Sequence, residues 1–510
     1  MSISRSTFTY QVIPSNITLP TALARSAYEE KYISLFWSAY LPGTRLLPPA
    51  TVRNAFGAWT NTLQDLYLTD DVLRKGFLAI CLATIGRQDG DRWMAEKGLE
   101  LYAGALRDMS AALTVPKQAK ERADELWIAS KLFSFHEAIN GADDKHGNAQ
   151  ATSWMAHSSG ELALINSRSP EQCIFGRAHQ LFVDGRLHVA ISSLLARKKC
   201  PLSRPEWKTI PWLHYAKSPK DILLDILIDI PTLYEEIDLM NELSMSSAAF
   251  SPSSSGNSSE DGKEGINNEH NTRENEIQIL RQVLIARFWD LDKRLQEWYE
   301  SVPIPREQAI PTPYPYFDNQ NWKDKDTKHG FWMGEFEVTV EQLALTHTLT
   351  LYWATCILLY TVTPEVLRLE QNPDTLKHST INNNKAKDNV TPLPTPCFPS
   401  ILPARMNPRR YIRHLIRAIP IFLHPSIGVF HVHLSTVPLG VVARELKKLE
   451  EEKEVDANEW GRTNMGMRVQ YQDGDDDDMA KERKLLRAYF ETDEARGIWR
   501  FIRGLPGGGG

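Results

Sequence analysis

Apolar residues recur at steps of three and four along most of the chain, a spacing that places them on one face of an α-helix. Alternation with a period of two, the pattern of a half-buried strand, is nearly absent. Three clear helical sets are Leu99, Tyr102, Leu106, Met109 and Leu113; Leu126, Ala129, Leu132, Phe133, His136 and Ile139; and Phe182, Val183, Leu187, Ala190, Ile191 and Leu194. We therefore predict an all-α fold, an irregular array of many helices with disordered insertions.

The helix predicted over 218–230 has the clearest boundaries. Ser218 suits the N-cap, Pro219 takes the first helical position, and the acidic Asp221 follows three residues after the cap. Pro231 should end or kink this helix, because proline lacks the backbone N–H that continues it. From Asp221 onward only one narrow stripe, made of aspartates, is polar, so we expect the helix to be largely buried. The apolar residues around the stripe include Ile222, Leu223, Ile226, Leu227 and Ile230.

Segments poor in apolar residues divide the chain. Residues 244–275 are rich in Ser, Asn, Glu and Asp and offer too little apolar area to offset the entropy lost on ordering. The predicted organisation is an irregular N-terminal arm (1–25), a first helical half (26–243), this disordered insertion (244–275), a second helical half (276–503) with loops at 301–330 and 371–408 and an acidic stretch at 450–478, and a Gly-rich tail (504–510).

The composition is that of an ordinary globular protein, 42% hydrophobic and 24% charged over 510 residues. With 58 Lys and Arg against 64 Asp and Glu, the net charge of −6 argues against coating nucleic acid by bulk electrostatics, because that mode needs an excess of cations. The five cysteines lie far apart without a C-x-x-C pair, so we interpret them as buried thiols and not as zinc ligands. They are Cys81, Cys173, Cys200, Cys356 and Cys397.

Neither a leader nor a membrane span is expected. Residues 1–6 are not followed by an apolar run of about 7 to 15 residues, which together with the odd cysteine count favours a reducing intracellular compartment. Residues 343–363 are the most apolar stretch, but they contain six threonines and His347. A spanning helix tolerates few such groups at its centre, so we predict a buried core helix there and no membrane contact.

Carboxylates and histidines supply no persuasive catalytic or metal site. Asp70 and Asp71 lack the one-turn spacing of a metal-binding helix, and Asp475 to Asp478 lie in the acidic run. Asp221, Asp225 and Asp229 recur every four residues, which suits metal ligation, but we favour a solvated helix edge. His414, His424, His431 and His433 share one segment, yet the last two would point about 200° apart on a helix. We favour core or partly exposed histidines.

Sequence motifs of common enzymes are missing as well. The chain has no G-x-S-x-G, and the segment His157 to Glu161 does not imitate it. It has no G-x-G-x-x-G and no G-x-x-x-x-G-K-[ST] either, so these nucleotide-binding loops are unsupported. We therefore assign no catalytic, cofactor-binding or metal-binding residue and predict that the protein is not an enzyme and needs no cofactor.

Two basic clusters could serve nuclear import, Arg197 to Lys199 and Arg405 to Arg413. We favour helix-end charge for both, because cations stabilise the carboxyl end of a helix. Neither cluster has the features of an arm that reads DNA bases, which would combine a groove-binding helix with a phosphate-binding surface.

Two stretches resemble a known family. Residues 175–186 (Phe-Gly-Arg-Ala-His-Gln-Leu-Phe-Val-Asp-Gly-Arg), 204–212 (Arg-Pro-Glu-Trp-Lys-Thr-Ile-Pro-Trp) and the helix from Lys217 to Met240 resemble the regulatory domain of fungal-specific zinc-cluster transcription factors. Residues 415–446, with Ile-Pro-Ile-Phe-Leu at 419–423 and Thr-Val-Pro-Leu-Gly at 436–440, resemble its C-terminal part. The likeness extends over most of 30–503 in order and hydrophobic pattern, and it includes no catalytic signature.

The resemblance implies a transcriptional regulator, often of a metabolic or secondary-metabolite gene cluster, located in the nucleus. Members usually carry an N-terminal DNA-binding module with six cysteines around two zinc ions, but residues 1–30 contain no cysteine. This departure argues against direct DNA binding. Three explanations stay open: a truncated gene model, a partner that reads DNA, or a helical region kept for another task in the same pathway.

The implied partners are proteins of the transcription machinery or a DNA-binding protein, with a small-molecule effector as a further option. The acidic stretch 450–478 could be an activation segment, but its few large apolar residues favour a solvated loop. The alternative function is that of a biosynthetic-pathway protein, an enzyme or ligand-binding protein that uses a cavity in the helical body and resides in the cytoplasm.

Overall fold

The computed structural model describes residues 21–41, 58–140, 149–249, 261–302, 339–370, 402–422, 427–428, 430–459, 479–491 and 493–505. Within these ranges the chain forms α-helices, short 3₁₀ turns and their connections, and no β-strand. The predicted all-α fold is confirmed.

The helices fall close to the predicted segments. Their bounds are α1 (Thr21–Tyr40), α3 (Ala58–Leu66), α4 (Asp71–Asp89), α5 (Arg92–Thr114), α6 (Pro116–Glu121), α7 (Ala123–Asn140), α8 (Ala149–Asn166), α9 (Gly176–Ala196), α10 (Pro205–Thr209), α11 (Pro219–Leu227), α12 (Ile230–Ala249), α13 (Asp261–Ser301), α14 (Val340–Tyr360), α15 (Thr363–Glu370), α16 (Pro408–Phe422), α17 (Phe430–Glu459), α18 (Ala480–Glu491) and α19 (Asp493–Gly504). Short 3₁₀ turns include η3 (Pro170–Cys173), η4 (Pro201–Ser203), η5 (Ile210–Trp212) and η8 (Ala404–Met406).

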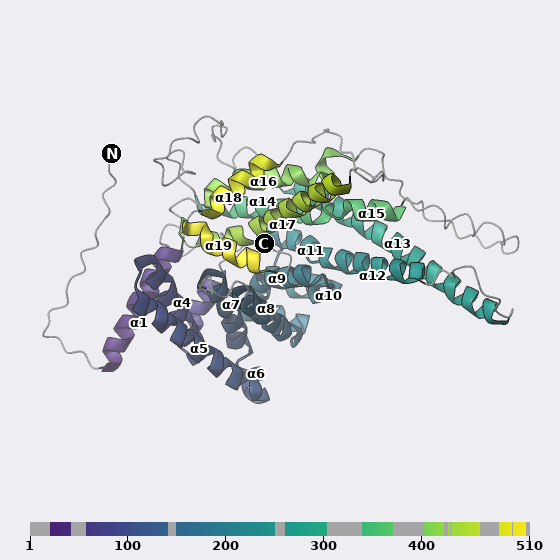
Figure 1. Cartoon of the computed structure of the whole chain (residues 1–510). Helices are drawn as coiled ribbons and strands as arrows, with labels where there is room; N and C mark the ends of the chain where they lie inside the picture. Colours follow the sequence, from purple (N-terminus) through teal and green to yellow (C-terminus); the bar gives the residue numbers. More distant parts are fainter. Residues whose placement is uncertain are drawn as a thin grey trace.

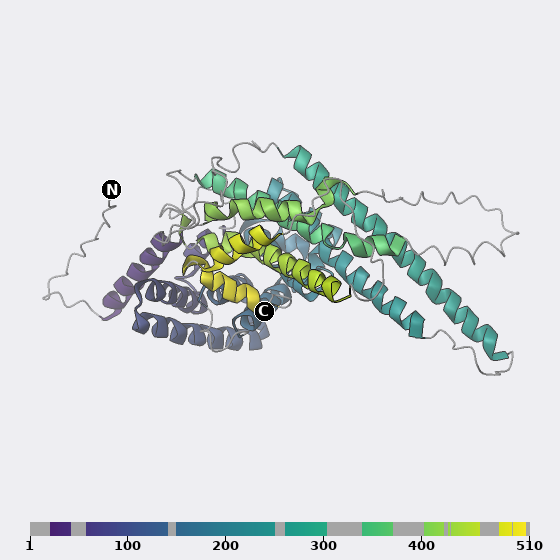
Figure 2. The ribbon, with the colours of Figure 1, turned by 45° about the horizontal axis from the view of Figure 1, so that its top comes forward.

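The helices form one elongated body. Helices α1, α4 and α5 lie at one end, α14, α16, α17 and α18 stack along one side, and the hairpin of α12 and α13 projects from the other end (Figure 1, Figure 2). The C-terminal helix α19 returns to pack on α7 and α8. Helices α9 and α11 occupy the middle of this arrangement, where α11 contacts α9, α12, α13 and α14.

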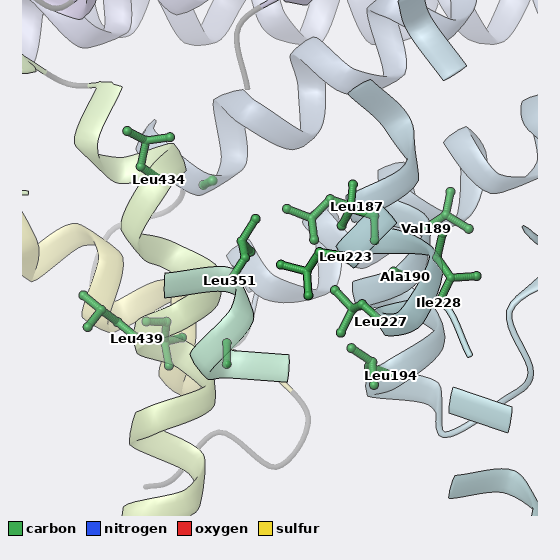
Figure 3. Close-up of a cluster of buried hydrophobic side chains, with 14 of the residues drawn as sticks. Leu187, Val189, Ala190, Leu194, Leu223, Leu227, Ile228, Leu351, Leu434 and Leu439 are labelled. Carbon is green, nitrogen blue, oxygen red and sulfur yellow. The ribbon is translucent and has the colours of Figure 1, made fainter. Parts of the chain in front are cut away.

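The buried core passes through these central helices. Leu223 and Leu227 of α11 face Leu187 and Leu194 of α9 on one side and Leu351 of α14 on the other (Figure 3). Leu227 is only 2% exposed, so the predicted burial of this helix is confirmed. The start of α11 is also as predicted, because Ser218 and Asp221 form a reciprocal capping box and Pro219 is the first helical residue. The helix ends before Pro231, which lies in the first turn of α12.

The predicted apolar face of α5 is only half right. Tyr102 and Met109 are buried, but Leu99 is 61% exposed and Leu113 is 43% exposed. The buried face of α5 includes small residues, and a Cβ atom at Gly98 would lie 2.9 Å from the Ala79 carbonyl oxygen of α4. Small residues let the two backbones approach closely, so the buried face lies to one side of the line of large apolar residues.

Several predicted low-structure segments contain helix. In the predicted irregular arm 1–25, α1 already begins at Thr21. Helix α12 continues through residues 244–249 and α13 begins at Asp261, so helical backbone enters both ends of the predicted insertion 244–275. Helix α17 likewise continues to Glu459 in the predicted acidic stretch. Lengthening an existing helix adds one hydrogen bond per residue without a new nucleation step, which explains these extensions. Residues 250–260, 303–338, 371–401 and 460–478 lie outside the described ranges.

The most apolar helix is α14. Within the described residues, the segment Gln342–Leu367 is the one whose length and composition would suit a membrane span, and most of it is buried among other helices. Two of the buried hydroxyls of α14 are satisfied within the helix: Thr348 donates to the Ala344 carbonyl at 2.9 Å and Thr355 to the Leu351 carbonyl at 2.7 Å. This arrangement is the one expected of a core helix.

Candidate functional site

The aspartate stripe of α11 is buried, so its interpretation as a solvated edge is wrong. Asp221 and Asp225 are 4% and 8% exposed, and the side chain of Asp229 is 13% exposed. The apolar Ile222 of α11, by contrast, is 45% exposed. The stripe turns inward because four cations from neighbouring segments cover it, and their charges offset the cost of burying carboxylates.

Arg186 of α9 is the most deeply buried of these cations, with 1% of its side chain exposed. Its guanidinium donates to an Asp225 carboxylate oxygen, lies 3.4 Å from the Asp221 Oδ1 atom, and donates to the Asp221 carbonyl at 3.3 Å. Lys217 contacts the other Asp225 oxygen. The Trp212 ring covers both cations, with its centroid 5.3 Å from the guanidinium carbon of Arg186 and 5.5 Å from Lys217 Nζ.

Asp229 is held from the opposite side by α10 and α13. Lys208 of α10 pairs with one of its carboxylate oxygens, and Arg294 of α13 donates to the other at 2.8 Å. Burial lowers the pKa of the Lys208 ammonium, and the Asp229 carboxylate opposes this effect. Lys208 and Arg294 both also donate to the Asp225 carbonyl, at 3.1 and 3.3 Å. We call the seven residues Arg186, Lys208, Lys217, Asp221, Asp225, Asp229 and Arg294 the α11 charge network.

A second buried charge lies beside this network. Glu161 of α8 is fully buried and accepts hydrogen bonds from Trp127 Nε1 at 3.2 Å and His188 Nδ1 at 3.0 Å. Burial alone would raise the pKa of Glu161, but Lys131 and His188 outweigh it, so this pKa lies below its usual range. A Cβ atom at Gly185 would lie 2.9 Å from Glu161 Oε1, which explains a glycine in the middle of α9.

A third polar cluster joins α5, α7 and α8. The Tyr102 hydroxyl donates to Glu137 Oε1 at 2.7 Å and lies 2.8 Å from His157 Nε2. The His136 ring stacks on Tyr102 at 4.1 Å, and among the described residues neither of its nitrogens has a hydrogen-bond partner. Burial lowers the pKa of His136 to about 3 and that of His157 to about 4. Both rings are therefore neutral near pH 7.

These two histidines should make the protein unstable in mild acid. In the unfolded chain a histidine becomes protonated below its pKa near 6.5, whereas in the folded protein His136 stays neutral until about pH 3. Because the unfolded state binds this proton and the folded state does not, the free energy of unfolding falls as the pH drops from 6.5 toward 3. For His136 alone we expect a loss of about 2 to 3 kcal/mol between pH 6.5 and 4.5. Glu137, whose pKa burial raises, acts in the opposite direction. Urea unfolding across this range measures the slope.

The matched variant for this prediction is His136→Phe. Phenylalanine keeps the ring on Tyr102 and removes the titrating group, so the loss of stability between pH 6.5 and 4.5 should shrink by about 2 kcal/mol. The stability near pH 7 should change little. A variant with the same acid sensitivity as the parent would show that His136 is not the titrating group.

The other groups identified in the sequence have structural contacts. Asp70 is the N-cap of α4 and pairs with Arg122. His414 stacks on Trp353 at 5.3 Å. Its pKa is lowered to about 4, mainly by burial and to a smaller extent by the charges of Arg410 and Arg417. His431 and His433 both lie in helical backbone of α17, so they do not share a face. The side chains of His424, His431 and His433 and residues Asp475 to Asp478 lie outside the described part of the chain.

The first basic cluster follows the carboxyl end of α9, as predicted. The second spans η8 and the amino-terminal turns of α16, so its interpretation as charge at a helix carboxyl end is wrong. Arg197 ends α9 with a positive φ of 50° and makes a bidentate pair with Asp238 of α12 at 2.7 and 2.8 Å. Arg405 pairs at 2.9 Å with Asp292, a buried carboxylate of α13 that also accepts from the Tyr360 hydroxyl. Cys81, Cys173, Cys200 and Cys356 are buried thiols, as predicted, and Cys397 lies outside the described ranges.

The charged and polar groups at these sites bind one another and hold neighbouring helices together. In the α11 charge network each carboxylate is engaged by at least one cation, and the network joins α9, α10, α11 and α13. In the described residues no group of three or more His, Cys, Asp and Glu side chains is arranged to hold a metal ion. The segment 175–186 contains Arg186 and Gly185, but the residues that they contact cannot be recognised from this segment. The polar cluster around Tyr102 is not among the sites expected from the sequence.

Comparison with protein-family models, curated proteins and solved structures finds no significant match.

Proposed function

We propose that the chain is a transcriptional regulator whose helical body is of the fungal-specific regulatory type and acts by contacting proteins. The observation that supports this most is the role of the residues that carry the resemblance. Phe182 stacks on Trp207 at 5.4 Å, a Cβ atom at Gly185 would collide with Glu161, and Arg186 binds the α11 aspartates. The resemblance thus rests on residues that build the centre of the molecule.

The all-α architecture is in keeping with the regulatory region that the resemblance implies. Residues 175–186, 204–212 and 217–240 cover the first half of α9, all of α10 and α11, and the first half of α12. The α11 charge network ties these helices to α13. A body organised in this way holds its surface helices in fixed relative positions, which suits the binding of protein partners. Under this proposal the protein resides in the nucleus and reaches DNA through a partner.

A tethering experiment tests the proposal. The full chain is fused to an unrelated DNA-binding module, and transcription is measured from a reporter with sites for that module. We expect the fusion to raise or lower transcription relative to the module alone, because a regulatory body brought to a promoter should act there without its own DNA-reading part. Leu227→Asp, which should not fold, serves as the inactive variant and Ile222→Asp as its folded control. A folded fusion of equal abundance that leaves transcription unchanged would contradict the proposal.

A further inference from the structure

Helices α16 and α18 carry an excess of positive charge on the outside of the body. Together they contain eight Lys or Arg and two Glu, although the chain as a whole has a net charge of −6. Arg413 of α16 lies 3.5 Å from Glu482 of α18, so the two helices lie side by side. Both views place them next to each other (Figure 1, Figure 2).

The exposed cations follow helical spacing on both helices. Two of them are seven residues apart on α16, and three recur at steps of three on α18, so each set lies on one side of its helix. We call these five exposed residues the C-terminal basic surface: Arg410 and Arg417 on α16 and Lys481, Lys484 and Arg487 on α18. Within the described ranges, none of the five pairs with a carboxylate.

The charge of this surface affects a neighbouring group. His414 lies between Arg410 and Arg417 along α16. After burial, the charges of these two arginines are the cause that lowers its pKa to about 4. The arginines therefore create a positive potential at the surface of α16, in addition to being exposed.

The size and setting of the surface favour a short acidic partner. Helix α16 has 15 residues and is about 22 Å long, which is the length of about seven residues of extended chain. A long polyanion such as duplex DNA would extend past this surface over a body whose remaining charge is negative. Helix α17, which packs on α16, exposes Glu450 and Glu451. A short acidic segment gains the attraction without meeting these carboxylates.

We propose that the C-terminal basic surface binds a short acidic segment of a partner protein. The attraction acts between exposed charges, so it weakens as the ionic strength rises. This assignment rests on the function proposed above, in which the chain acts by contacting proteins. Its test measures binding directly, so a negative result would leave the transcriptional role to be decided by the tethering experiment.

Fluorescence anisotropy of a labelled deca-aspartate peptide, titrated with the full chain, tests this assignment. We expect binding that weakens about fivefold or more when salt rises from about 50 to about 200 mM, because exposed charges are screened. Arg410→Glu with Lys484→Glu reverses one charge on each helix and should raise the dissociation constant about tenfold or more.

Lys117→Glu with Lys120→Glu is the matched control. These exposed residues lie on α6, which Figure 1 shows on the opposite side of the body from α16 and α18. This double variant changes the net charge by the same amount, and it should alter the dissociation constant by less than about twofold. All four positions are exposed, so both variants should melt at the temperature of the parent. Equal weakening in the two double variants would overturn the assignment.

A labelled DNA duplex of about 20 base pairs distinguishes a nucleic acid from an acidic protein segment. We expect the duplex to bind more weakly than the peptide. Tighter binding of the duplex, lost in the Arg410→Glu, Lys484→Glu variant, would assign the surface to nucleic acid and overturn the proposal.

The chain's own acidic run is a competitor that a further variant removes. This variant carries Asp475→Asn, Asp476→Asn, Asp477→Asn and Asp478→Asn. We expect it to bind the peptide at least as tightly as the parent, because fewer carboxylates compete for the same cations. Absence of peptide binding by both chains would overturn the proposal.

Discussion

Leu227→Asp should abolish the folded state, so that the variant is recovered as aggregate or lacks the cooperative unfolding transition of the parent. Leu227 is 2% exposed and lies between Leu223 of α11 and Leu194 of α9 (Figure 3). The substitution removes about 2 kcal/mol or more of apolar burial and places an unpaired carboxylate in the core, where the cost is several kcal/mol more. The total approaches the whole stability of a typical domain. Far-UV circular dichroism during thermal unfolding measures the effect.

Ile222→Asp is the control for this prediction. It introduces the same charge into the same helix, five residues earlier, at a position that faces water. We expect a soluble protein with a helical spectrum and melting temperature close to those of the parent. If Leu227→Asp also remained soluble with an unchanged melting temperature, the described burial of α11 would be incorrect.

Arg186→Met should lower the free energy of unfolding by about 3 to 5 kcal/mol. Methionine approximates the volume of the arginine stem, so the loss comes mainly from leaving the Asp221 and Asp225 carboxylates without their central buried partner. Lys217 still contacts Asp225 and limits the loss. Chemical denaturation near pH 7 measures it. Arg92→Met, at an exposed pair with Glu96, is the control and should leave stability unchanged within error.

Local signals in the sequence predict the start of α11 well. The cap at Ser218 depends only on Pro219 and Asp221 beside it, so no distant part of the fold is needed to predict it. The buried face of α5 is harder to predict, because a periodic pattern of large apolar side chains does not show where small residues let two helices pack closely. The helices α4 and α5 instead approach each other closely at Gly86 and Gly98, and Leu99 is left exposed.

The environment of the α11 stripe could not be predicted from its own pattern. A four-residue repeat of aspartate fixes a common face but not what covers that face. The covering cations Arg186 and Arg294 are 39 and 65 residues away from the aspartates they bind, and only the packing of α9 and α13 brings them there. The signal that could have found them is a charged residue at a position where helical periodicity expects an apolar one, such as Arg186 in α9 or Glu161 in α8.

The measurement that tests the α11 charge network most directly is a double-mutant cycle on Arg186 and Asp225. Arg186→Met, Asp225→Asn and the double variant are compared with the parent by chemical denaturation near pH 7. If the two groups are buried partners, the double variant should lose about 2 kcal/mol less than the sum of the single losses. Additive losses, with a coupling energy near zero, would show that the helices around α11 are not joined through these charges.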